Sequence, residues 1–478
     1  MTIRSLVLAL GTAVLAAPAA AAQPADTLPT ALAPFVAVHA PVVALTHVQV
    51  VDGTGAPARA DQTVLIADGR IAAVGPSAEV EIPAGAEVHD LSGHTVIPGI
   101  VGLHDHTFYT TRARRTQLNF SAPRLYLASG VTTIRTTGSY CPYCELNLLR
   151  TIESGAAPGP RIYVTGPYLT GVGGGDQMSW LSGPDDARRV VAYWADEGVS
   201  WFKAYTRISR ADLAAAIDEA HKRGLKVTGH LCSVSFREAV ELGIDNLEHG
   251  YFSNSDWVPG KEPDRCPQNM TEINAALDVD SEEVAKTIRA MVDHDVAMTT
   301  TVAIYELIVP ARPAVLDERI GRVLAPEAYQ DYLAAREQIV HAADSAGSVW
   351  PELFRKAQIF ERKFHEAGGL LAAGVDPTGI GGALPGFGDQ RNYELLLEAG
   401  FSPAEAIQVM TLNGARVLGD DDEYGSIEAG KKADLVVIEG DPVTEPAAIR
   451  DVRIVFKDGL GYDSEKLLAS VEGVVGIR

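Results

Sequence analysis

The chain has 478 residues, of which 46% are hydrophobic and 21% are charged, as in an ordinary globular protein with ample core. Length alone indicates about three units of roughly 150 residues, or one large barrel with a smaller domain. Acidic residues outnumber lysine and arginine by 62 to 40, so the formal net charge is -22. A strongly acidic surface argues against nucleic acid or anionic membranes as partners.

Residues 1–22 have the pattern of a signal peptide. Met1-Thr2-Ile3-Arg4 carries positive charge, Ser5 to Ala17 is apolar, and Ala20-Ala21-Ala22 offers a cleavage site before Gln23. The apolar run is too short to span a bilayer comfortably. We expect a periplasmic or secreted protein that starts near Gln23 and has no membrane contact after signal removal. A retained anchor is the alternative.

Strand patterns occur at both ends of the chain. After an Ala/Pro-rich stretch over residues 23–42, which we expect to be a flexible leader, residues 43–95 contain short alternating apolar runs. Asp68-Gly69 between two such runs predicts a hairpin. Strand patterns return in residues 419–478. We therefore predict one small β-sandwich domain that both chain ends build together.

Residues 96–418 alternate between strand and helix patterns. The predicted strands cover residues 96–104, 130–136, 161–165, 199–205, 225–230, 246–249, 297–303 and 370–375. Predicted helices include residues 210–222, 236–242, 281–292, 351–365 and 402–418. Eight such units predict an α/β fold of the (β/α)8 TIM-like barrel type. A doubly wound open sheet is the alternative, but no G-x-G-x-x-G follows the first strand.

The first barrel strand ends in His104-Asp105-His106. Side chains alternate along a strand, so both imidazoles project from the same face at its carboxyl end. In a parallel barrel this end forms the floor of the active site. Two neighbouring imidazoles suit zinc, iron, copper or nickel. Asp105 points the other way and is expected to have a structural role.

Further polar residues stand at the ends of later predicted strands. They are Lys203, His230, His249 and Asp376. Histidine accounts for only 12 of the 478 residues, so four of them at strand ends are unexpected by chance. Barrel enzymes collect their catalytic residues from several strand ends at one face. The sequence therefore predicts a metal centre, and imidazole with carboxylate ligands favours zinc.

These motifs resemble those of the amidohydrolase superfamily of metal-dependent hydrolases. Within it, the chain is most similar to the imidazolonepropionase-like branch with its exported metal-dependent dipeptidases. The resemblance covers nearly all of the chain after the leader. The matching pieces are Pro98 to His106, Lys203, His230, Glu248-His249-Gly250, Gly374-Val375-Asp376 and Gly425 to Val437.

The resemblance implies two divalent metal ions, zinc by preference. The implied ligands are His104, His106 and Asp376 for one metal and His230 and His249 for the other, with Lys203 as a bridging N6-carboxylysine. An unmodified ammonium has no lone pair and cannot bind a cation. The alternative for this lysine is an ion pair in the barrel wall.

The resemblance also implies an activity. A metal-bridging hydroxide would attack a C–N amide bond of a small peptide or N-acyl amino acid, and Asp376 would act as the proton shuttle. The alternatives are hydrolysis of a cyclic amide (lactam or imidazolone type) or lactone, and a non-catalytic metal-binding scaffold. The expected partner is a small molecule. Relatives are often homo-oligomers, so self-association is also expected.

One departure from the family concerns substrate binding. Related dipeptidases commonly have a tyrosine two positions after the strand 5 histidine, where this chain has Cys232. Tyr251, just after His249, is a candidate replacement that would contact the substrate. The alternative is that Tyr251 only packs beneath a loop.

The four cysteines favour disulfide bonds, because an exported protein with an even count usually pairs them. Cys141-Pro-Tyr-Cys144 predicts a local disulfide, with a redox pair and half a zinc knuckle as alternatives. Cys232 and Cys266 both follow strand ends on the same face, and a second disulfide between them is a hypothesis.

Overall fold

The computed structural model describes residues 28–315 and 317–477. The predicted signal peptide, residues 1–22, lies outside the described residues, as does the start of the predicted leader. Among the helices of the described part, none is both long enough and apolar enough to cross a membrane.

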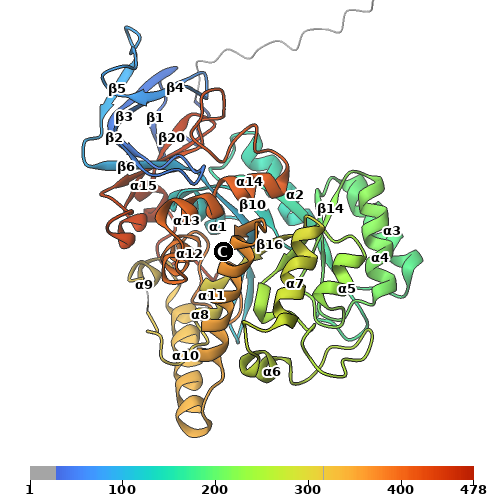
Figure 1. Ribbon diagram of the computed structural model, residues 1–478. Coiled ribbons are helices and arrows are strands. Elements are labelled where there is room, and N and C mark those ends of the chain that lie inside the picture. The colour runs from blue at the N-terminus through green and yellow to red at the C-terminus, as the bar shows by residue number, and fades with distance from the viewer. Residues whose placement is uncertain (1–27, 316, 478) are drawn as a thin grey trace, which may run out of the picture.

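Eight parallel strands form the predicted barrel, paired in chain order from the first strand to the last (Figure 1). They are β7 Ile100–Asp105, β10 Val131–Thr136, β11 Arg161–Thr170, β13 Trp201–Ala204, β14 Lys226–Gly229, β15 Asn246–Glu248, β16 Ala297–Thr300 and β17 Leu371–Ala373. The short strand β12 Ser179–Trp180 adds to the end of β11. The (β/α)8 architecture is confirmed.

Helices connect the strands and cover the outside of the barrel. They are α1 Ser121–Ala128, α2 Pro142–Glu153, α3 Pro184–Glu197, α4 Arg210–Lys222, α5 Phe236–Glu241, α6 Met270–Ala276, α7 Glu282–Asp293, α8 Val302–Glu306, α9 Arg319–Val323, α10 Pro326–Ala346, α11 Trp350–Glu366, α12 Phe387–Glu398, α13 Pro403–Met410, α14 Leu412–Leu418 and α15 Ser464–Ala469. Several begin at serine caps, which satisfy free N–H groups of the first turn. Ser402 and Glu405 form the predicted capping box of α13.

A backbone hydrogen bond closes the barrel between its last and first strands. Asp376 N donates to His104 O over 2.7 Å, just beyond β17. Gly374 permits this approach, since a Cβ there would lie 2.2 Å from the backbone nitrogen of His104. The barrel seam therefore brings two predicted metal ligands together.

The predicted first strand, residues 96–104, is in fact two strands that belong to different sheets. Strand β6, His94–Pro98, pairs with β18 in the terminal sheet, and β7 starts at Ile100. At Gly99, between them, a Cβ would lie 2.1 Å from Thr132 Oγ1. The apolar sequence continues across the break because both strands are buried, so periodicity alone does not reveal it.

The predicted helix over residues 402–418 is also interrupted. Thr411 has φ -128° and ψ -84°, which ends α13 before α14 begins. Within α14, Gly414 lies against β7: a Cβ there would be 2.8 Å from Val101. The break lets α14 pack under the first barrel strand, a long-range contact that helix propensity does not encode.

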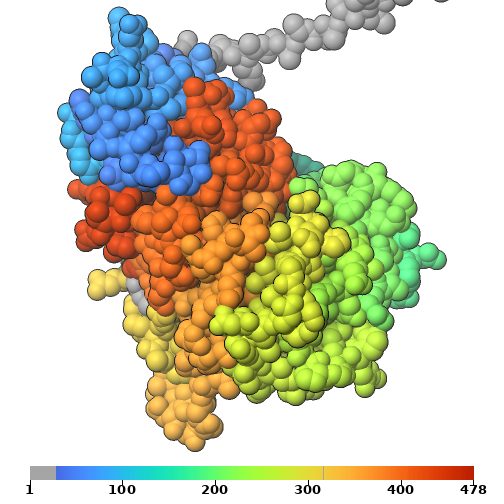
Figure 2. All heavy atoms as spheres, viewed as in Figure 1, coloured from blue at the N-terminus to red at the C-terminus, as the bar shows by residue number. Residues whose placement is uncertain are grey.

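Both chain ends contribute strands to one sheet beside the barrel, where we predicted a β-sandwich domain. Its strands are β1 Val36–Val38, β2 Val42–Val50, β3 Arg59–Ala67, β4 Arg70–Pro76, β5 Glu87–Asp90, β6 His94–Pro98, β18 Leu435–Glu439, β19 Val452–Lys457 and β20 Leu460–Asp463. The N-terminal and C-terminal segments lie side by side in one lobe (Figure 2). Residues 28–42, expected to be flexible, are instead packed: Leu32 is buried and β1 pairs with β20.

The seam predicts the effect of a single added methyl group. Gly374→Ala should lower the free energy of unfolding by about 1–3 kcal/mol, because the Cβ would collide with backbone rather than with a movable side chain. Gly321→Ala in α9 is the matched control, since its nearest neighbour would be 3.8 Å away. Equal stability of both variants in urea unfolding would contradict the close approach.

Candidate metal centre

The six predicted metal-binding residues converge at the carboxyl end of the barrel. They are His104 and His106 from β7 and its end, Lys203 on β13, His230 after β14, His249 after β15 and Asp376 after β17. Five of them line a cavity of about 470 Å³, and His249 lies beside it with its ring centroid 4.5 Å from that of His104.

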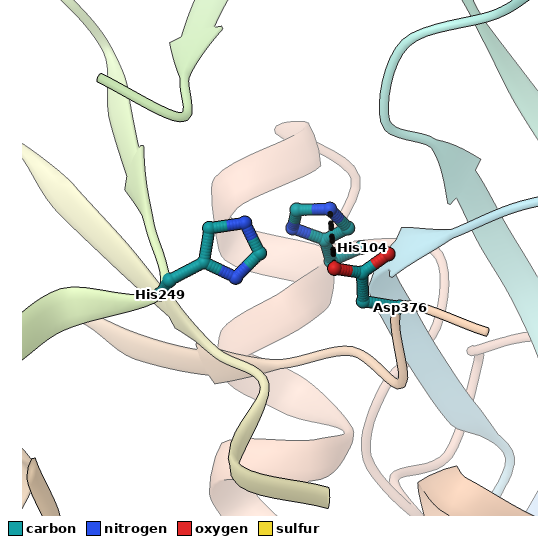
Figure 3. Close-up of side chains that lie close together, drawn as sticks. All are labelled: His104, His249 and Asp376. Atoms are coloured by element: carbon teal, nitrogen blue, oxygen red, sulfur yellow. Dashed lines mark ion pairs between the residues drawn. The ribbon is translucent and has the colours of Figure 1, made fainter. Parts of the chain in front are cut away.

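His104, His249 and Asp376 face one another at the centre of this group (Figure 3). One ligand atom from each lies within 4.8 Å of the others. The Asp376 carboxylate also approaches His106, with Oδ1 3.3 Å from Nε2. The rings of His230 and His249 are 4.3 Å apart. The two predicted ligand groups thus form one continuous cluster.

Two of these residues occupy a strained backbone region. His249 has φ 66° and Asp376 has φ 49°. Residues other than glycine rarely adopt positive φ, and such strain tends to persist at functional sites where surrounding structure imposes it. In both cases the conformation turns a side chain at a strand end into the cluster.

Burial prepares the imidazoles for metal binding. It lowers the pKa of His230 to about 4 and holds the pKa values of His104 and His249 well below the ordinary range. The rings are therefore neutral and carry a free lone pair. His249 Nδ1 contacts Thr301 Oγ1 at 2.7 Å, which leaves a buried Nε2 without a hydrogen-bond partner. This donor set fits a divalent metal ion.

Lys203 is completely buried, and its Nζ has no hydrogen-bond partner. Burial lowers its pKa to about 8, although nearby Glu248 and Asp376 oppose the shift. No ion pair joins it to a carboxylate in the described residues, so the alternative of a wall ion pair is not observed. A neutral amine is the form that reacts with carbon dioxide, and an unpartnered buried Nζ fits a position awaiting a ligand.

A buried ion pair that sequence reasoning missed supports the centre from below. Glu248 accepts from Arg135 Nη2 at 2.6 Å, and its other oxygen lies 2.7 Å from His104 Nδ1. This contact leaves Nε2 of His104 directed at the cluster, the arrangement that commonly orients metal-binding histidines. The sequence did contain a signal for this pair: one predicted buried strand carries Arg135, and another carries Glu248, which has the opposite charge.

Aromatic residues on and after the barrel strands form the cavity wall, and sequence reasoning missed them too. They are Phe108, Tyr140, Tyr168, Tyr205 and Tyr305. Tyr205 lies against the ligand His230, with ring centroids 5.0 Å apart. Thr378, from the glycine-rich loop after β17, donates to Asp376 Oδ1 at 2.9 Å. A wall of this kind accommodates an apolar group beside a few polar anchors.

Tyr251 is not part of this wall, which corrects the predicted substrate contact. Its ring is buried against Trp257 and Phe360, and its hydroxyl donates to the backbone oxygen of Asn274 at 3.0 Å. The short 3-10 turn at residues 250–252 directs the side chain outward from the barrel axis into the helix layer. Tyr251 therefore has the packing role.

All four cysteines are disulfide-bonded. Cys141 pairs with Cys144 at the start of α2, and Cys232 pairs with Cys266. The second bond attaches the loop before α6 to the segment just after His230.

Asp105 is buried beneath the candidate ligands, and its Oδ1 accepts from Val375 N at 3.1 Å, in keeping with a structural role.

Comparisons with known proteins show which proteins this chain resembles. The amidohydrolase family model matches residues 356–460. A dihydroorotase from Pelotomaculum thermopropionicum is 23% identical over 407 residues, which are 81% of this chain and 86% of that protein. An imidazolonepropionase from a Geobacillus species is 36% identical over 83 residues, 16% of this chain and 18% of that protein. A crystal structure from Bifidobacterium longum, provisionally named a prolidase, is 28% identical with TM-score 0.66, covering 90% of this chain and 98% of that one.

The Glu248–Arg135 pair gives a prediction for stability and metal affinity. Glu248→Ala should lower the free energy of unfolding by about 3–5 kcal/mol, because Arg135 would stay buried without a partner. Metal affinity should fall roughly 10–100-fold as His104 loses its orienting contact. Adding Arg135→Met should recover stability in denaturant unfolding without recovering metal affinity. Recovery of both would show that Glu248 does not orient the histidine.

Glu145 on α2 gives a prediction for pH dependence. Burial raises its pKa to about 8, although hydroxyls of Thr136 and Thr107 bind the carboxylate. Between the ordinary value of 4.5 and about 8, the folded protein keeps a proton that the unfolded chain has lost. The free energy of unfolding should therefore fall as pH rises through this window.

Glu145→Gln should flatten that decline, measured by urea unfolding of the chelator-treated protein. The exposed Glu153→Gln on the same helix is the control and should leave the pH profile unchanged. An unaltered profile for Glu145→Gln would show that Glu145 is ionised in the folded protein at neutral pH.

Proposed function

We propose that this chain is an exported metal-dependent hydrolase of C–N bonds that cleaves an amide bond in a small peptide or N-acyl amino acid. The amidohydrolase family match over residues 356–460 and the similarity to dihydroorotase, imidazolonepropionase and a provisionally named prolidase support a hydrolase of this kind. The observation that carries the proposal is the buried cluster of neutral histidines, Asp376 and an unpartnered Lys203 around one cavity. A scaffold that only stored a metal would not need a deep cavity beside the ligands.

Two zinc ions are the cofactors that this donor set would hold. His104, His106, His230, His249, Asp376 and a carbamylated Lys203 are the proposed ligands. When bound, zinc lowers the pKa of water toward neutrality and polarises a carbonyl oxygen. Neutral imidazoles and carboxylate oxygens are donor types that zinc accepts in proteins.

Asp376 is the proposed proton carrier. Burial alone would raise its pKa, but His104, His106 and Lys203 hold it well below the ordinary range, so the carboxylate is ionised and able to accept a proton. Thr378 fixes one of its oxygens. In the proposed reaction, Asp376 takes the proton of the attacking water and delivers it to the leaving nitrogen, which departs as a neutral amine.

A linear peptide or N-acyl amino acid is the first candidate substrate, because the solved structure with 28% identity is named a prolidase. Cyclic amides and lactones are the second candidate class, since a relative that matches across most of the chain is named a dihydroorotase.

Export is supported by the signal pattern of residues 1–22 and by two disulfides, which persist in oxidising compartments.

The test combines metal content with turnover. The purified mature protein should hold close to two zinc ions per chain, and its turnover of a panel of dipeptides, N-acyl amino acids, lactams and lactones should vanish with chelator and return with zinc. The panel members that are cleaved identify the substrate class. Absence of both bound metal and turnover would refute the proposal.

Two variants separate the proposed roles. Lys203→Ala should lower the metal content from about two ions to one or fewer, because the bridging ligand is lost. Asp376→Asn, assayed at matched metal content, should reduce kcat by about 10²–10⁴-fold, the usual contribution of a positioned acid–base group. Full turnover in Asp376→Asn would remove the proton-carrier role, and two retained metals in Lys203→Ala would remove the bridge.

A further inference from the structure

A positive charge outside the proposed ligand set borders the catalytic cavity. Among the described residues that line it, Arg115 is that cation, since the histidines are neutral and Lys203 is the proposed carbamate. Lys203 is buried at the floor, whereas Arg115 is exposed at the mouth. A solvated cation at the entrance of a cavity in a chain with net charge -22 indicates a site for an anion.

The Arg115 guanidinium is held in place but not neutralised. It lies over the ring of Tyr140, with Cζ 3.9 Å from the ring centroid, and Nη1 donates to Gln177 Oε1 at 3.3 Å. No carboxylate forms an ion pair with it anywhere in the described part of the chain, although Asp176 stands beside Gln177. Most of its N–H donors are therefore free, and an arginine fork matches the two oxygens of a carboxylate.

The position of Arg115 is set by a hairpin that continues directly from the metal ligands. The hairpin consists of β8 Phe108–Thr110 and β9 Arg115–Gln117, in which Thr110 pairs with Arg115. Arg114 anchors it to α10 through Asp331, with Nε 2.6 Å from Oδ2. Arg115 is thus the guanidinium of this hairpin that faces the cavity.

Two aromatic rings connect Arg115 to the metal centre. Beneath the guanidinium, Tyr140 has its ring centroid 4.8 Å from that of Phe108, and Phe108 is 4.4 Å from His106. Arg115 therefore stands at the same cavity as the candidate ligands, with the rings of Tyr140 and Phe108 between its guanidinium and His106.

We propose that Arg115 is the carboxylate-binding residue of the substrate site, with Tyr140 as its supporting platform. This inference rests on the proposed function: a small peptide and an N-acyl amino acid both carry a free carboxylate one residue from the amide bond. Arg115 then selects free acids over their neutral amides and orients the scissile carbonyl toward the cluster. The aromatic wall accepts the apolar side chain of the same residue.

The chain offers two matched controls. Arg112, on the same hairpin, does not line the cavity, and its Nη1 donates to Gln338 on α10 at 2.5 Å. Arg207 lines a neighbouring cavity of about 880 Å³ that shares His230 with the catalytic one. If the substrate carboxylate points the other way, Arg207 rather than Arg115 would bind it.

The experiment compares a cleaved panel substrate as free acid and as C-terminal amide. Arg115→Ala should raise KM for the acid about 10–100-fold, the usual loss for a charge-assisted pair, with kcat changed less than about twofold. KM for the amide should not change, and Arg115→Lys should recover part of the loss. Arg112→Ala and Arg207→Ala should behave as the wild type at unchanged zinc content.

Three results would overturn the assignment. They are an unchanged KM for the acid in Arg115→Ala, an equal loss on acid and amide, and a loss that follows Arg207→Ala instead. If no panel member is cleaved, the proposed function fails, and calorimetry with N-acetyl-L-phenylalanine and its C-terminal amide tests Arg115 separately. Weaker binding of the acid alone in Arg115→Ala would support the carboxylate site, and equal binding by wild type and variant would refute it.

Discussion

The hydrogen bond from Asp376 N to His104 O joins two residues that are far apart in the chain and brings two candidate metal ligands together. It closes the barrel between β17 and β7, so the first and the last ligand meet across the seam. Gly374 allows the contact because any side chain there would displace the His104 backbone. The same backbone contact therefore closes the barrel and brings the candidate ligands of its first and last strands together.

Burial then determines the chemistry of the groups that closure brings together. It keeps the imidazoles neutral and leaves Lys203 without a partner, while contacts with His106 and the neighbouring Lys203 keep the Asp376 carboxylate ionised. The remaining charge beneath the site is balanced by the pair of Glu248 and Arg135, both fully buried. A buried pair of this kind adds little net stability but becomes costly when one partner is lost. Its retention agrees with a role in orienting His104.

The barrel strands and the segments that follow them form different parts of the candidate site. The candidate metal ligands come from the carboxyl ends of strands, where the barrel holds them rigidly, whereas much of the cavity wall comes from segments that follow the strands. Arg115, Tyr140 and Thr378 all stand on such segments. This division is typical of barrels, in which chemistry stays on the scaffold and specificity varies with the loops.

The sequence by itself determined the barrel, the contribution of both chain ends to one sheet, and which polar residues stand at the strand ends around the cavity. All of these follow from local patterns: strand periodicity, Asp-Gly turns, and polar residues that end apolar runs, such as His104 and His230. Only the tertiary structure decided the break at Gly99, the outward turn of Tyr251 and the position of Arg115 over Tyr140. Each depends on which distant segments meet, and neither propensity nor periodicity records such meetings, because they describe a residue and its near neighbours along the chain.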